Sequence, residues 1–147
     1  MIIIKLSIVS FCIGVTPFFE FYQGKNGLKK KLCTFYIHVP DKFNKKEMTA
    51  YGCPNDKAKS MKVCYAREGT NITVYDDPEY REGKDDWTTI IVNHDMGNDR
   101  CETISDFETD KDYEFLEVDY KTTGNLNGKV SSFTILQGII FLLFKTK

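Results

Sequence analysis

The chain has no stretch in which apolar residues recur at three- and four-residue spacing between helix caps, as an amphipathic helix requires. Short runs rich in β-branched and aromatic residues stand instead between clusters of Gly, Asn, Asp and Pro, which favour turns. This alternation predicts an all-β sandwich with little helix. The expected strands cover residues 34–39, 60–65, 71–75, 87–92, 113–120 and 129–135.

The composition supports one packed domain. The chain is 147 residues long, and its 41% of hydrophobic residues suffices for the core of one domain. Because the formal net charge is -1, no overall positive field exists, and we expect no nucleic-acid partner. The basic run at residues 29–31 predicts a solvated turn, with a small binding patch as the alternative.

Residues 1–14 predict a signal peptide and therefore secretion. They are mostly apolar, carry Lys5 near their start and are too short to span a bilayer. Cleavage after Gly14 would leave two small residues, Cys12 and Gly14, at the positions that a signal peptidase inspects. The alternative is a buried N-terminal strand.

Residues 136–147 are the second apolar terminal segment. Their apolar run is about half the length that a membrane span needs, so we expect no stable span. The alternatives are a final strand with an adhesive tail, or an artefact of how the gene was read. We assign this tail no function.

Cysteine usage agrees with export. Cys12 would leave with the signal peptide, and the remaining even number predicts two disulfides in an oxidising compartment. Their wide spacing makes a zinc site a poor fit. Three connectivities are possible, and the sequence does not choose among them. The four cysteines are Cys33, Cys53, Cys64 and Cys101.

A glycosylation sequon, Asn71-Ile72-Thr73, fits the same compartment. Asn71 is therefore a candidate glycosylation site. The acidic run within residues 76–86 predicts a solvated turn, with cation binding as the alternative.

Two segments of the chain look like variants of one another. Residues 55–60 read Asn-Asp-Lys-Ala-Lys-Ser, and residues 127–132 read Asn-Gly-Lys-Val-Ser-Ser. Each places turn-forming polar residues before a hydroxyl side chain and then a strand. After the first segment come Tyr75, Tyr80 and Gly83 within a turn-rich stretch.

At these residues the chain resembles the βγ-crystallin family. The Greek keys of that family carry an aromatic residue, a second aromatic five positions later and a glycine two beyond. Tyr75 and Tyr80 match this spacing, and Gly83 stands one position late. The resemblance implies a folded hairpin in which the aromatic side chains stack as a corner and the glycine takes a positive φ.

The resemblance covers residues 32–135, which we take as one Greek-key β-sandwich domain of the βγ-crystallin type, held by disulfides. In its first key, His38, Phe43 and Lys45 would stand where two aromatics and a glycine are expected, so this key is degenerate. The spacing of the two polar segments implies an insertion around residues 87–107.

The resemblance also implies a calcium motif in the two polar segments, with each site shared between them. One site would pair Asp56 with Ser131. The other would pair Gly128 with Lys59, which supply no carboxylate and a repelling ammonium group. We therefore expect at most one calcium ion; the alternative is that both segments are merely polar turns.

These observations predict a secreted, non-enzymatic module with a structural or binding role and an unknown protein or glycan ligand. His38 and His94 belong to no recognisable catalytic motif, so we name no catalytic residue. The alternative function is a recognition or defence protein on the same sandwich. A protease inhibitor would use a loop pinned by Cys53 and Cys64, and a carbohydrate binder would present Trp87 or clustered Tyr.

Overall fold

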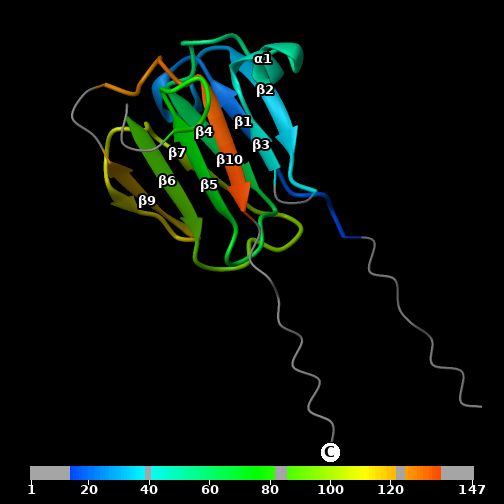
Figure 1. Cartoon of the computed structure of the whole chain (residues 1–147). Helices are drawn as coiled ribbons and strands as arrows, with labels where there is room; N and C mark the ends of the chain where they lie inside the picture. The colour runs from blue at the N-terminus through cyan, green and yellow to red at the C-terminus, as the bar shows by residue number, and fades with distance from the viewer. Residues whose placement is uncertain (1–13, 39–40, 82–85, 122–124, 137–147) are drawn as a thin grey trace, which may run out of the picture.

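The computed structural model describes residues 14–38, 41–81, 86–121 and 125–136, which form two antiparallel sheets packed face to face (Figure 1). The four-stranded sheet contains, in spatial order, β2 (Lys31–Tyr36), β1 (Phe18–Tyr22), β4 (Ser60–Cys64) and β7 (Cys101–Ile104). The six-stranded sheet contains β3 (Asp41–Phe43), β10 (Ser132–Leu136), β5 (Asn71–Tyr75), β6 (Trp87–Val92), β9 (Leu116–Lys121) and β8 (Lys111–Asp112). The described helices are short: α1 (Lys45–Ala50) and the 3-10 turn η1 (Lys25–Gly27).

The strand order is that of two interleaved Greek keys. The first key is β1 to β4, and the second consists of β5, β6, β7 and β10. The third strand of each key pairs in the sheet of the other, β3 with β10 and β7 with β4. The predicted all-β Greek-key sandwich is confirmed.

The predicted place of the insertion is wrong. Residues 87–92 are β6, the regular second strand of the second key, and β7 follows as its third strand. The extra strands are β8 and β9, which come after β7 and extend the sheet beyond β6. Residues 87–107 look like an insertion because β7 has only four residues and carries little strand signal.

The core lies between the sheets, where the two-residue period of the strands directs alternate side chains. Phe19 and Phe21 of β1 are fully buried, and Phe133 of β10 meets them from the other sheet at ring-centroid distances of 5.2 and 6.0 Å. Phe35 of β2 lies 4.6 Å from Phe133. Each such ring contributes about 1.5–3 kcal/mol by burial, so this cluster holds the two sheets together.

Strand β1 was not predicted from the sequence. It pairs with β2 on one side and β4 on the other, so it lies inside the sheet. The folded unit therefore begins no later than Phe18, further toward the N-terminus than the predicted residue 32. The predicted strand at 113–120 begins only at Leu116, because Tyr113 turns back to donate its N–H to the carbonyl of Leu116.

The described cysteines form two disulfides, Cys33–Cys53 and Cys64–Cys101, with Cα–Cα distances of 5.1 and 4.0 Å. The first ties β2 to the loop after α1, and the second joins the neighbouring strands β4 and β7. This is one of the three connectivities that the sequence left open. Within the described ranges, no helix has the length and apolar character needed to cross a bilayer.

Peptide mapping of the non-reduced protein tests this connectivity. We expect the two linked peptide pairs Cys33–Cys53 and Cys64–Cys101. Replacing both cysteines of either pair by serine should lower the unfolding free energy by about 2–4 kcal/mol, because the unfolded chain gains freedom. A Cys53–Cys64 peptide would contradict both of these disulfides.

Candidate functional site

A buried serine pins the hairpin of the first key. Ser60, the first residue of β4, donates its hydroxyl to the carbonyl of Gly24 at 2.6 Å and accepts the N–H of Gly27 at 2.9 Å. Gly27 has a φ of +67°, which glycine adopts without strain. The hairpin of the first key therefore lies between β1 and β2, and its predicted position at His38, Phe43 and Lys45 is wrong.

The second key repeats this arrangement. Ser132, the first residue of β10, donates to the carbonyl of Asp77 at 2.6 Å and accepts the N–H of Tyr80 at 3.0 Å. Tyr80 has a φ of +50° and stands where the first key has Gly27. Gly83, for which we predicted the positive φ, lies outside the described residues. Ser60 and Ser132 both end a six-residue polar segment, so those segments are structurally equivalent.

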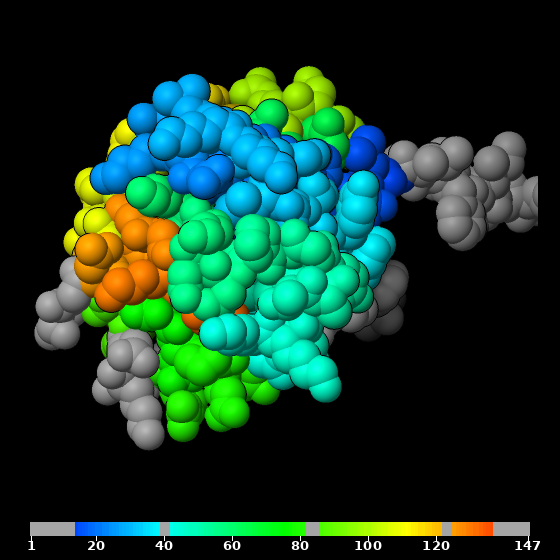
Figure 2. Space-filling view, turned by 90° about the horizontal axis from the view of Figure 1, so that it is seen from above, coloured from blue at the N-terminus to red at the C-terminus, as the bar shows by residue number. Residues whose placement is uncertain are grey.

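The two polar segments meet at one end of the sandwich. The N–H of Gly128 donates to the carbonyl of Ala58 at 2.7 Å, and the N–H of Asp56 donates to the carbonyl of Val130 at 3.4 Å. In Figure 2 the orange segment before β10 lies against the blue-green segment before β4. The equivalence of the two keys thus brings residues together that are far apart in sequence.

Asp56 and Ser131 are in direct contact. The Ser131 hydroxyl donates to Asp56 Oδ1 at 3.1 Å and lies 3.2 Å from the carbonyl oxygen of Lys129, a second acceptor. A carboxylate, a hydroxyl and a carbonyl oxygen therefore converge, which is the donor set that a hard cation prefers. The neighbouring Asn55 has a buried Oδ1 with no hydrogen-bond donor among the described residues.

The set has a single carboxylate. Nowhere in the described part of the chain do three or more His, Cys, Asp or Glu side chains form a group that could hold a metal. The residues at this end fit a calcium ion only with carbonyls, hydroxyls and water as most of its ligands.

Gly128 and Lys59, the other pair implied by the resemblance, also lie side by side. A Cβ atom added to Gly128 would stand 3.3 Å from Cε of Lys59, so the lysine stem covers the glycine. No side-chain carboxylate comes from this pair, and its ammonium group repels a cation. The two equivalent positions therefore differ in chemistry, as the sequence predicted.

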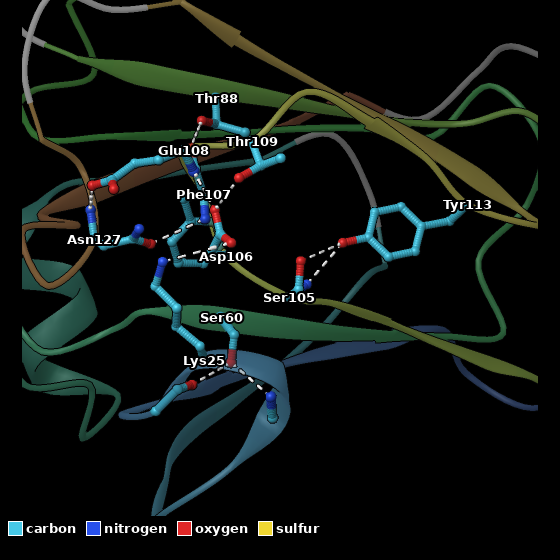
Figure 3. Close-up of polar contacts among 12 residues, drawn as sticks. Lys25, Ser60, Thr88, Ser105, Asp106, Phe107, Glu108, Thr109, Tyr113 and Asn127 are labelled. Atoms are coloured by element: carbon cyan, nitrogen blue, oxygen red, sulfur yellow. Dashed lines mark hydrogen bonds and ion pairs between the residues drawn. The ribbon is translucent and has the colours of Figure 1, made fainter.

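A polar network fixes the start of the second segment (Figure 3). Asn127 accepts the N–H of Phe107 at 3.0 Å and donates its own N–H to Glu108 Oε1 at 2.6 Å. Asp106 caps the same turn and lies 3.7 Å from the ammonium group of Lys25 in the first hairpin. Neither Glu108 nor Asp106 was predicted from the sequence, because Glu108 accepts a backbone N–H and Asp106 contacts a backbone N–H and a lysine far away in the chain.

A hollow of about 430 Å³ lies on the outer face of the six-stranded sheet, away from the core; we call it the outer hollow. It is lined by Lys42, Thr73, Tyr75, Tyr80, Thr89 and Thr134, with Asn71 and Leu136 at one end. Thr73 and Tyr75 are 7% and 4% exposed and form its floor. Lys42 Nζ stands 5.3 Å from the ring centroid of Tyr80.

The hydroxyl contacts inside the outer hollow are long. Thr73 and Thr89 are 3.3 Å apart, and the Tyr75 hydroxyl is 3.4 Å from that of Thr134. The Thr73 hydroxyl also donates to Asn71 Oδ1 at 3.3 Å, so Thr89 donates to Thr73, and both threonines keep lone pairs that can accept from a polar ligand. Trp87 pairs with Tyr75 in register and is half-buried.

Asp77 holds the hairpin that carries Tyr80. It is only 2% exposed, accepts the N–H of Glu79 at 2.7 Å and pairs with Arg81 at 3.0 Å. Burial alone would raise the pKa of Asp77, but the hydrogen bonds from Arg81 and the backbone outweigh it, and the pKa lies below its ordinary value. The predicted solvated acidic turn is thus wrong for Asp77.

The remaining predicted residues lie apart from these sites. His38 and His94 are exposed, and the ring of His38 lies 6.2 Å from that of Tyr36. Cys53 and Cys64 bond to different partners, so the loop between them is not closed by a mutual disulfide.

Comparison with known proteins gives matches to solved structures alone. No protein-family model matches the chain, and no curated protein matches it. A βγ-crystallin domain from Clostridium beijerinckii is 16% identical, with a TM-score of 0.41 over 83% of this chain and 98% of that one. The N-terminal domain of Protein S is 12% identical, with a TM-score of 0.43 over 82% and 96%.

A βγ-crystallin domain from Flavobacterium johnsoniae is 15% identical, with a TM-score of 0.39 over 81% of this chain and 93% of that one. Similarity at this level concerns the fold alone. The βγ-crystallin domains among these structures are of the family that the sequence resembles.

Acid titration of unfolding tests the role of Asp77. Because its folded-state pKa is depressed, its contribution is present above the unfolded pKa and disappears as pH falls through the folded value. Asp77→Asn should lower stability by about 1–3 kcal/mol near neutral pH. The difference from wild type should vanish in acid. Glu79→Gln, at an exposed side chain, is the control and should change neither the stability near neutral pH nor its dependence on pH. A pH-independent difference would contradict the charged contact with Arg81.

Proposed function

We propose that this chain is an extracellular, non-enzymatic module with a binding or structural role, whose two Greek keys are joined by one calcium ion. The observation that carries the proposal is the 3.1 Å contact between Ser131 and Asp56, which belong to different keys. A cation placed there would link the loops of both keys, and so would couple ligand binding to the stability of the whole sandwich.

Asp56, Ser131 and the carbonyl of Lys129 would hold the ion. A bound calcium ion would supply the positive charge that balances the Asp56 carboxylate, and Asp56 and Ser131 would be its side-chain ligands. Asp56 has a φ of +55°, a conformation that Asp tolerates better than most residues, so its carboxylate is presented by the backbone turn itself. With a single side-chain carboxylate, affinity should be modest.

Two observations support an extracellular location. The four described cysteines are paired in disulfides, which persist in oxidising compartments. The sequence of residues 1–14 has the pattern of a signal peptide. The partner proposed for this module is a protein or a glycan.

Of the alternative functions, the protease inhibitor would use the loop between Cys53 and Cys64, whose two ends are anchored by separate disulfides. A carbohydrate-binding role keeps one observation in its favour, the outer hollow with Tyr75 and Tyr80 in its lining.

Calorimetry with calcium tests the proposed site. We expect one ion per chain, and a gain in unfolding free energy of about 2.7 kcal/mol at a hundredfold excess over the dissociation constant. Asp56→Ala should abolish both effects, because it removes the carboxylate. Lys59→Ala, at the position of the other pair that corresponds to Ser131, is the control and should leave both effects in place.

A gain-of-site variant makes the test stricter. Lys59→Ser together with Gly128→Asp should create a second site of the same composition. Gly128 has a φ of +85°, at which a side chain is strained, but Asp56 adopts a φ of +55° at the equivalent position, and Lys59→Ser removes the nearest side-chain atoms. Absence of heat and of any stability change at millimolar calcium in the wild type would overturn the calcium proposal.

A further inference from the structure

The glycosylation sequon lies in the lining of the outer hollow. Both of its functional residues, Asn71 and Thr73, contribute side chains there. We propose that Asn71 carries an N-linked glycan whose first sugars lie in the outer hollow, over the threonine hydroxyls and toward Tyr80. The proposal rests on the extracellular location given above, because the sugar is attached in the secretory pathway.

Strand geometry aligns the acceptor with the hollow. Ile72 and Val74 are fully buried, so the two-residue period turns Asn71, Thr73 and Tyr75 to the outer face. Successive outward residues are about 6.7 Å apart along a strand, which places Tyr75 about 13 Å from Asn71. A chain of sugars that starts at Asn71 therefore runs along the hollow.

The amide group of Asn71 is arranged for attachment. Its Oδ1 accepts the hydroxyl of Thr73 at 3.3 Å, and Nδ2 has no hydrogen-bond partner among the described residues. Substitution at Nδ2 leaves the contact with Thr73 intact. The backbone of Asn71 is paired with Leu136 and Ile91, so transfer of the sugar precedes completion of the sheet.

The attachment reaction balances with a lipid-pyrophosphate-linked oligosaccharide as donor. A bond forms between Nδ2 and the anomeric carbon of the first N-acetylglucosamine. The bond from that carbon to the pyrophosphate oxygen breaks, the pyrophosphate keeps the electron pair, and the amide loses one proton.

The lining suits a sugar. The Thr73 hydroxyl donates to Asn71 Oδ1, so Thr89 donates to Thr73, and the hydroxyls of Thr73, Thr89 and Thr134 keep lone pairs that can accept from sugar hydroxyls. Tyr80 offers a half-buried ring at the far end, against which an apolar sugar face can pack. Leu136, directly opposite Asn71, is 56% exposed and would be covered by the first sugar.

A free carbohydrate is the competing occupant. The position of the acceptor favours the attached glycan: Asn71 lies at one end of the hollow, so attachment fills it without any diffusing ligand.

The test uses the full chain secreted from eukaryotic cells, with intact mass and peptide mapping to locate the glycan. We expect one glycan, on Asn71. A peptide-N-glycosidase should release it from the folded protein about tenfold more slowly than from the unfolded one, the factor that a contact of aromatic-pair strength would impose. Tyr80→Ala should speed this release.

A relocated glycan is the matched control. Asn71→Gln with Leu28→Thr moves the sequon to Asn26, which is exposed in the first hairpin. Its glycan should be released equally fast from folded and unfolded protein. We expect Tyr80→Ala, and likewise the strand-preserving Thr134→Val, to lower the melting temperature more in the chain glycosylated at Asn71 than in the chain with the relocated glycan. This comparison separates the loss of glycan contacts from a general folding defect, which would affect both chains equally.

The outcomes are distinct. A secreted chain that carries the relocated glycan but none at Asn71 overturns the inference and leaves the extracellular location standing. Equal release rates from Asn71 and from the relocated site also overturn it. Retention of every variant inside the cell overturns the extracellular location and the inference together, while the calcium titration of refolded protein still tests the proposed calcium site.

Discussion

The exchange of third strands between the two Greek keys is the constraint on which the rest of the structure depends. β3 leaves the first key to pair with β10, and β7 leaves the second to pair with β4. The segments that precede β4 and β10 must then cross at the same end of the sandwich. The contact between Asp56 and Ser131, 75 residues apart, follows from that crossing.

The two keys are equivalent in backbone and different in chemistry. Ser60 and Ser132 make the same pair of hydrogen bonds to their hairpins. The side chains around them have diverged: Tyr80 replaces Gly27, and Lys59 faces Gly128 where the other side has Ser131 and Asp56. A duplicated scaffold therefore carries one oxygen-rich position and one closed by a lysine stem.

The strands that could be predicted from the sequence are those whose β-branched and aromatic runs stand between clear clusters of turn-forming residues. β5 and β6 have the predicted bounds because their β-branched and aromatic residues stand between turn clusters; half-buried and buried residues alternate along β6, whereas every residue of β5 after Asn71 is buried. β3 and β7 have three and four residues, too few for any period, and α1 depends on a capping box formed by Asn44 and Glu47. The disulfide pairing follows from the strand exchange, which is a non-local property. The pairing of Asp56 with Ser131 was predicted from the resemblance to the βγ-crystallin family. The outer hollow could not be predicted, because the register of the six-stranded sheet brings its residues together.

The most direct measurement of the shared site is a double-mutant cycle between Asp56 and Ser131. Unfolding free energies of the wild type, Asp56→Ala, Ser131→Ala and the double variant are measured with and without saturating calcium. Residues in contact couple by about 0.5–3 kcal/mol, and the ion should raise the coupling because both side chains then share it. A coupling energy that calcium does not change, or strictly additive losses, would contradict a site held jointly by the two keys.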